Sequence, residues 1–310
     1  MRLVEDVHKI FTLSVSDLFA FLQRKLAFAN YTYVRGKKFL YAINESYHTI
    51  PILLVAHLDT VHPQPKEISV KDGFLVCDDA SGLGADDRAG VLCILNMIKK
   101  GYRPSVLFTD GEESGCIGAQ EFADFAKAPD VNLMVEIDRA GSNHFAFYTN
   151  KLTGELTEYM QECTGLSGSP GSITDIAVLT SEYNIDSVNI ACGYYNNHTL
   201  KERLNIQEFF EACRCVQNIL DNPPQSKLEP CEEPYAQNYW KMSNRYVYDS
   251  FYDEWQDNAD VLATITVDDV LAFCTKKEAD RILALPKTAM EYMFVEGLTC
   301  LLSSQRQLLE

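Results

Sequence analysis

Four short, largely apolar runs in this chain each lead into residues that can bind a metal ion or transfer a proton. The runs cover residues 53–56, 105–109, 133–137 and 188–191. Nearly continuous apolar sequence is what strands buried on both faces require. The chemically active residues that follow the runs are, in order, His57 with Asp59, Glu112 with Glu113, Asp138, and His198. Because open α/β sheets place their sites at the carboxyl ends of the strands, the pattern predicts that these side chains meet at one sheet edge.

Helical segments alternate with the runs. Apolar spacing predicts an opening helix at 16–28, with Ser16 or Asp17 as its cap, and a hairpin from strands at 31–34 and 38–43. The later helices are predicted at 87–99, 118–126, 153–164, 174–183 and 205–220. This alternation predicts an α/β fold with three layers, α/β/α, around a central, mostly parallel mixed sheet.

The predicted domain organisation has a catalytic domain and a smaller C-terminal unit. The catalytic domain covers residues 1–222, and a polar, proline-containing linker covers 223–234. Residues 235–310 are rich in aromatic residues at first and then helical in pattern, so we expect a small, mainly helical appendage. Its role stays open between covering apolar surface, limiting the substrate and forming oligomers.

Composition excludes several classes of function. A net charge of -17 argues against nucleic acid or an anionic membrane as partner, because phosphate binding needs clustered Lys and Arg. The first residues are acidic where a secretory signal would be basic and apolar. The ten cysteines are scattered, and we expect reduced thiols in a cytoplasmic protein.

One stretch between the first two runs adds a further acidic motif. Residues 84–90 read Gly-Ala-Asp-Asp-Arg-Ala-Gly. With it, the order His57, Asp86, Glu112-Glu113, Asp138, His198 resembles the co-catalytic zinc aminopeptidase and aminoacylase clan. This clan includes tripeptidases, glutamyl aminopeptidases and deacylases, and the resemblance covers roughly residues 50–215.

Two spacings bear on the branch of the clan. Asp59 and Asp86 are 27 residues apart, and Asp138 and His198 are 60 apart. Neither gap is large enough for the second domain that many members carry, and the later gap leaves room for one strand, two helices and a loop. The spacing of the motifs therefore resembles that of the simple aminopeptidases and predicts a lidless catalytic domain. The residues within the motifs, in contrast, resemble those of branches with an extra domain.

The resemblance implies a centre with two divalent metal ions. Asp86 would bridge them, His57 and Asp138 would complete one site, and Glu113 and His198 the other. Zn is the expected metal, with Co or Mn as alternatives, because the ligands are imidazoles and carboxylates without thiolate. The resemblance also implies a cis peptide between Asp86 and Asp87, and Asp87 could cap the helix that follows.

Two catalytic roles are assigned beyond the ligands. By resemblance, Glu112 is the general base that takes a proton from the attacking water and returns it to the leaving amine. Asp59 lies two residues after His57 on an extended strand end, so it can accept the proton of the non-ligating imidazole nitrogen and orient the ring.

Three further features have competing interpretations. Tyr194 or Tyr195 could donate to the developing oxyanion, or could simply pack in their loop. The segment ending in Thr174 and Asp175 resembles one near the clan's substrate site, but either residue could instead cap a helix. His62 could face the substrate or be exposed beside Pro63.

The sequence thus predicts a metal-dependent amide hydrolase, and the leading interpretation is an aminopeptidase acting on short peptides. An N-acyl-amino-acid deacylase is the alternative among enzymes, since the same groups hydrolyse either amide. A catalytically silent binding or scaffold protein is the alternative from another class, although five costly buried ionisable groups argue against it. A homo-oligomer is left open.

Overall fold

The computed structural model describes residues 2–44, 50–77, 79, 81–148 and 154–227. The predicted appendage at 235–310 and most of the predicted linker lie outside the described residues. The strands are β1 (Thr32–Arg35), β2 (Phe39–Ile43), β3 (Ile50–His57), β4 (Ile68–Lys71), β5 (Phe74–Cys77), β6 (Pro104–Thr109), β7 (Leu133–Arg139), β8 (His144–Tyr148), β9 (Ser167–Pro170), β10 (Ser187–Ala191), β11 (Tyr194–Tyr195) and β12 (Arg203–Asn205). The helices are α1 (Arg2–Thr12), α2 (Val15–Phe28), α3 (Ala85–Lys100), α4 (Ile117–Phe125), α5 (Gly154–Thr164), α6 (Asp175–Tyr183) and α7 (Ile206–Asp221).

The main sheet has eight strands in the order β1-β2-β6-β3-β7-β10-β8-β9. Its four central strands, β6, β3, β7 and β10, run parallel, and β2 and β8 pair antiparallel on either side of them. The predicted α/β class and mostly parallel mixed sheet are therefore confirmed. The four apolar runs are the four central strands, so their carboxyl ends do share one edge.

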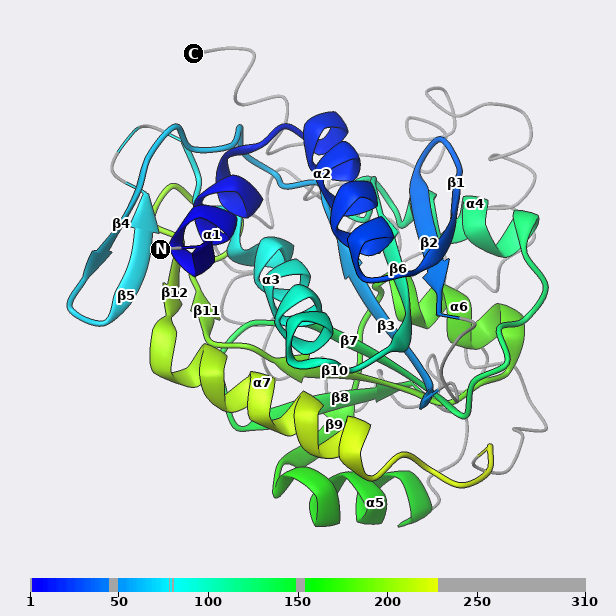
Figure 1. The fold of residues 1–310 in the computed structure, drawn as a ribbon. Helices are drawn as coiled ribbons and strands as arrows, with labels where there is room; N and C mark the ends of the chain where they lie inside the picture. Colours follow the sequence, from blue (N-terminus) through cyan, green and yellow to red (C-terminus); the bar gives the residue numbers. More distant parts are fainter. Residues whose placement is uncertain (1, 45–49, 78, 80, 149–153, 228–310) are drawn as a thin grey trace, which may run out of the picture. The chain divides into compact units, whose positions relative to one another are not determined.

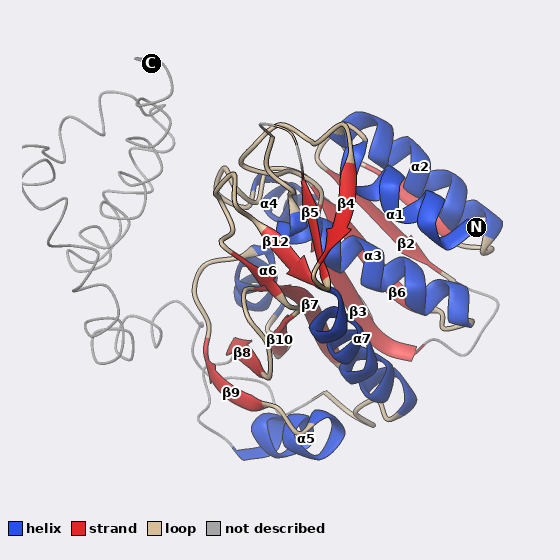
Figure 2. Cartoon of the chain, turned by 90° about the vertical axis from the view of Figure 1, so that its left-hand side faces the viewer, coloured by secondary structure: helices blue, strands red, loops and turns tan. Residues whose placement is uncertain are grey.

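Helices cover both faces of the sheet (Figures 1 and 2). Along β3, Leu54 and Ala56 belong to the core beneath α2, α3 and α7, whereas Leu53 and Val55 belong to the core beneath α4 and α6. Alternate residues of one strand thus enter opposite cores, which explains why the run is apolar throughout.

The N-terminal helices differ from the prediction. The chain begins with an additional helix, α1, and α2 begins at Val15 with Ser14 as its cap, so the expected caps Ser16 and Asp17 are wrong. The Ser14 hydroxyl accepts from the Asp17 N–H at 3.2 Å and donates to the Asp17 carboxylate at 2.7 Å. Asp17 is thus the partner of the cap residue, three residues after it.

A small antiparallel sheet, β11-β12-β5-β4, was not expected from the sequence. The β4–β5 hairpin lies between Asp59 and Asp86, and β8, β9 and β11 accompany β10 between Asp138 and His198, where one strand was expected. The described residues of both intervals belong to the two sheets and to the helices that pack on them. Among the described helices, none is long and apolar enough to cross a membrane.

The described cysteines are free thiols, as predicted. They are Cys77, Cys93, Cys116, Cys163, Cys192, Cys213 and Cys215.

Candidate metal centre

The residues predicted to hold metal come from two strands and three other segments. His57 is the last residue of β3, and Asp138 lies near the end of β7. Asp86 lies at the start of α3, Glu113 lies in the loop after β6, and His198 lies in the turn after β11. We call these five residues the ligand cluster. The structure brings all five together at the carboxyl edge of the central strands.

Asp86 lies between the two histidines of the ligand cluster. Its Oδ1 is 3.0 Å from His57 Nε2, and its Oδ2 is 3.2 Å from His198 Nε2. Each carboxylate oxygen therefore addresses a different imidazole, which is the arrangement that a bridging carboxylate needs.

The remaining two carboxylates divide between the histidines. Asp138 Oδ2 is 3.7 Å from His57 Nε2, and Glu113 Oε1 is 3.1 Å from His198 Nε2. His57 with Asp138 and His198 with Glu113 therefore form the two groups that the clan resemblance implies for two ions.

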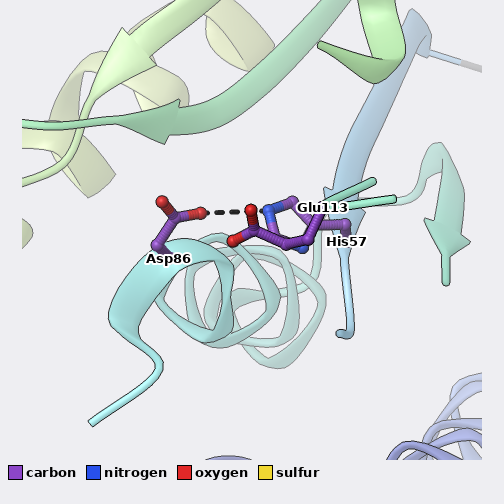
Figure 3. Close-up of side chains that lie close together, drawn as sticks. All are labelled: His57, Asp86 and Glu113. Atoms are coloured by element: carbon purple, nitrogen blue, oxygen red, sulfur yellow. Dashed lines mark hydrogen bonds and ion pairs between the residues drawn. The ribbon is translucent and has the colours of Figure 1, made fainter. Parts of the chain in front are cut away.

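The spacing of these donor atoms suits divalent metal ions. Ligand atoms about 2.0 to 2.2 Å from a tetrahedral zinc ion lie about 3.3 to 3.6 Å from each other. The four nitrogen–oxygen distances in the cluster run from 3.0 to 3.7 Å. Among the described residues, donor atoms of His57, Asp86 and Glu113 all lie within 4.8 Å of one another, and Figure 3 shows these side chains converging. The residues present fit a metal centre of nitrogen and oxygen ligands.

The charge balance of the cluster also favours cations. Burial alone would lower the pKa of His57, but the carboxylates of Asp138, Asp59 and Asp86 outweigh burial and raise it well above its usual value. Hydrogen bonds to Asp86 and Glu113 raise the pKa of His198 to about 10. The carboxylates around both imidazoles therefore favour positive charge at this position.

Glu112 and Glu113 are adjacent but face different histidines. Glu113 contacts His198, whereas Glu112 Oε2 lies 4.0 Å from His57 Nε2. Burial raises the pKa of Glu112 to about 8, and the negative charges of Asp175, Glu113 and Asp86 add to this effect while His57 opposes it. Glu112 is thus close to the cluster without joining the closest contacts of Asp86.

Asp59 does more than the sequence predicted. Its Oδ1 is 3.5 Å from His57 Nδ1, which has a closer partner in the Asp59 backbone carbonyl at 3.0 Å. The carboxylate instead accepts from the backbone N–H groups of Gly111, Glu112 and Glu113 at 2.7, 3.2 and 3.2 Å. Asp59 therefore positions the loop that carries both glutamates as well as facing the imidazole.

The start of α3 has the geometry that the resemblance implied. The Asp86–Asp87 peptide is cis, and both residues have non-helical backbone angles. The Asp87 carboxylate accepts from the Gly90 N–H at 2.8 Å, so Asp87 caps the helix as expected. A Cβ at position 90 would overlap the Asp87 carboxylate, which explains the glycine.

Both tyrosines considered as oxyanion donors have other partners. The buried Tyr194 hydroxyl donates to Asp138 Oδ1 at 3.1 Å, and the Tyr195 hydroxyl donates to Glu208 Oε2 at 2.6 Å. Each hydroxyl already donates to a carboxylate, so this arrangement favours the packing interpretation over donation to the oxyanion. His62 lies beside the cluster, with Nε2 3.0 Å from the His198 carbonyl oxygen.

Thr174 and Asp175 do not cap α6 with their side chains. Thr174 donates instead to Glu136 Oε2 at 2.7 Å, and Asp175 accepts from Thr109. Both side chains are buried, so they form a polar layer inside the domain. The helix-cap interpretation is wrong because an acceptor on β7, Glu136, and a donor on β6, Thr109, compete for these groups.

Asn189 and Glu202 make positioning contacts that were not predicted from the sequence. Asn189 on β10 accepts from the Asp138 N–H at 2.8 Å and donates to the Asp138 carbonyl at 2.7 Å. The β7–β10 register shifts between Asn189 and Ala191, so the side chain satisfies backbone groups at an irregular point of the ladder. Glu202 accepts from the N–H groups of Gly84 and Asp86. The sequence signal for Asn189 was a polar residue inside an apolar run, whereas Glu202 had only its closeness to His198.

The chain resembles known peptidases in sequence and in fold. The model of Peptidase family M28 matches residues 39–187, which include every member of the ligand cluster except His198. A search of curated protein sequences finds no match.

Solved structures share the fold at low sequence identity. Aminopeptidase PepT from Bacillus cereus is 15% identical with a TM-score of 0.58, and the match covers 71% of this chain and 97% of that one. A Staphylococcus aureus tripeptidase is 16% identical with a TM-score of 0.59, again over 71% and 97%. The Pyrococcus horikoshii TET1 peptidase, described as assembling into a tetrahedron or a large octahedral shell, is 13% identical with a TM-score of 0.54, over 70% and 99%.

The family match, the shared fold and the metal-binding geometry agree on the class, a metal-dependent peptidase. Within that class, residues 39–187 match Peptidase family M28, and the motif order resembles the clan of co-catalytic aminopeptidases and aminoacylases.

Proposed function

We propose that this protein is an aminopeptidase that hydrolyses short peptides at a centre of two divalent metal ions. The observation that carries the proposal is the position of Asp86, whose two oxygens contact His57 and His198 separately at 3.0 and 3.2 Å. His57 and Asp138 would hold one ion and Glu113 and His198 the other, with Asp86 shared. Zn is the proposed metal, with Co or Mn as alternatives.

In this mechanism, bound divalent ions would polarise the scissile carbonyl and make a water acidic enough to deprotonate near neutral pH. Glu112 takes the proton of the attacking water and later gives it to the leaving amine. Its position supports this role, because it borders the cluster but is not among the closest contacts of Asp86. Asp59 holds Glu112 in place through the backbone N–H groups of residues 111–113.

The choice of an aminopeptidase is supported by the relatives. Structures described as an aminopeptidase and a tripeptidase share the fold across nearly their whole length. We further propose a homo-oligomer, because the TET1 peptidase is described as forming large assemblies. Light scattering on the purified full chain would measure the mass directly, and a monomeric mass at all concentrations would contradict this part.

A matched substrate panel tests the function. The Zn- or Co-loaded protein is incubated with aminoacyl amides, dipeptides and tripeptides, with the same peptides N-acetylated, and with N-acyl amino acids. We expect hydrolysis of peptides with a free amino terminus and little hydrolysis of their N-acetylated counterparts. Selective release of amino acids from N-acyl amino acids would instead show a deacylase.

A further inference from the structure

Both carboxylate oxygens of Glu202 accept hydrogen bonds from the backbone around Asp86. Its Oε2 accepts from the Gly84 N–H at 2.6 Å, and its Oε1 accepts from the Asp86 N–H at 3.0 Å. The side chain is buried, with a residue exposure of 6%. These contacts join two segments that are more than a hundred residues apart in the chain.

Glu202 lies four residues after His198. Its own N–H donates to the Thr199 carbonyl at 3.2 Å, and the next residue begins β12, which pairs with β5. The backbone of Glu202 is therefore fixed between the His198 turn and the small sheet. Its carboxylate thus ties the segment of Asp86 to the segment of His198.

The Asp86 segment needs such a partner because it is not helical. Gly84 has a left-handed φ of 69°, and Asp86 and Asp87 also depart from helical angles. Backbone N–H groups in such a segment have no partner within the helix, and leaving them buried and unpaired is costly. A single carboxylate can accept from two of them at once.

Burying a carboxylate costs desolvation free energy, which is unfavourable for a purely structural contact. Burial and the negative charge of Asp86 raise the pKa of Glu202 to about 7, so keeping this carboxylate ionised is unfavourable. In its ionised form, Glu202 adds to the negative charge that attracts divalent cations to the cluster. Charge and position together link Glu202 to metal binding.

We infer that Glu202 is a positioning residue that holds Asp86 against His198 and thereby fixes the two metal sites relative to each other. This inference rests on the proposed dinuclear function. Asp59 makes the equivalent connection elsewhere in the cluster, since it follows His57 and holds the backbone of Glu112 and Glu113.

The test compares metal binding in Glu202→Gln, Glu202→Asp and the control Glu208→Gln. Glu208 is a half-buried glutamate whose carboxylate accepts from Tyr195, so its substitution makes the same chemical change away from the Asp86 backbone. Zn²⁺ stoichiometry and affinity are measured by competition with a chelator. The visible absorption spectrum of the Co²⁺-loaded protein reports ligand geometry, and circular dichroism reports folding.

We expect Glu202→Gln to bind metal about 10- to 100-fold more weakly than the wild type, with a changed Co²⁺ spectrum. Glu202→Asp keeps both acceptors on a shorter side chain and should recover part of the affinity, while Glu208→Gln should match the wild type. A folded Glu202→Gln protein with wild-type affinity and spectrum would overturn the inference.

If Glu202→Gln does not fold, Glu202→Asp decides: reduced affinity supports the inference, and wild-type affinity with a wild-type spectrum overturns it. Wild-type protein that binds no metal would refute the proposed function itself, and the inference with it.

Discussion

The ligand cluster has a strand half and a loop half, and the two are held in different ways. The strand half is His57 on β3 with Asp138 on β7, and the loop half is Glu113 with His198. The His57 side chain is fully buried, whereas the His198 side chain is 50% exposed and its residue has a left-handed φ of 59°. The sheet ladder positions the first pair, because β3 and β7 pair in parallel up to Val55 and Glu136, two residues before His57 and Asp138.

The loop half depends on side chains that reach across from other segments. Asp59 holds the backbone of Glu113, His62 contacts the carbonyl of His198, and Glu202 holds the segment of Asp86 near that turn. Variants in the two halves should therefore affect different quantities, fold stability in one case and metal affinity in the other. Weakening the strand half should destabilise the fold, whereas weakening the loop half should mainly release metal.

The largest expected effect is on catalysis. Glu112 faces His57 in the strand half, whereas the adjacent Glu113 contacts His198 in the loop half. Glu112→Gln removes the basic oxygen pair but keeps the shape, so kcat should fall by about 10² to 10⁴ while both metals stay bound. Glu113→Gln is the matched comparison and should weaken one metal instead. Steady-state kinetics with metal analysis measures both. Wild-type turnover in a fully metal-loaded Glu112→Gln protein would end the proposed mechanism.

The next effect concerns stability in the strand half. Asn189→Ala removes the side chain that pairs with the part-buried N–H and carbonyl of Asp138. An unsatisfied buried group costs about 1 to 3 kcal/mol, so the free energy of unfolding should fall by at least that amount. Urea denaturation of the metal-free protein measures it.

The control for this prediction is Asn218→Ala, because the exposed Asn218 side chain donates to the Cys163 carbonyl at the surface. Its effect should stay within about 0.5 kcal/mol. If the two variants unfolded at the same urea concentration, Asn189 would not support the strand half as described.

The strand half was also the part that the sequence predicted best. Continuous apolar runs mark β3, β6, β7 and β10 because both faces of these strands are buried, and the ionisable residues that follow the runs indicate the site edge. The supporting contacts were harder to foresee. Asn189 and Glu136 interrupt those runs, but a polar residue in a strand does not reveal its partner until the register is known.

The small sheet shows a second limit. β4 and β5 have four residues each and are only partly buried, so they lack a strong periodic pattern. The Asp72–Gly73 turn between them has positive φ at both positions, which is the geometry of a two-residue hairpin loop. The dipeptide was therefore the available signal for this hairpin.

The smallest effect is predicted in the loop half at His62. His62→Ala removes the contact with the His198 carbonyl, so metal affinity should fall by no more than about tenfold, the worth of one net hydrogen bond. The stability of the metal-free protein should change by less than about 0.5 kcal/mol, because the side chain is partly exposed. Chelator competition and urea denaturation measure the two quantities.

His144→Ala is the control for His62, since His144 contacts the Ser142 carbonyl outside the cluster and should leave metal affinity unchanged. A large loss of stability in His62→Ala, with metal affinity intact, would reverse the proposed division between the halves.

The central claim is that Asp86 joins both halves into one centre of two ions. Its most direct test is the number of metal ions per chain, measured by elemental analysis after dialysis, in the wild type, His57→Ala, His198→Ala and Asp86→Ala. The account predicts two ions in the wild type, mainly the loss of one in each histidine variant, and reduced occupancy at both sites in Asp86→Ala. An Asp86→Ala protein that still holds two ions with near-normal affinity would contradict it.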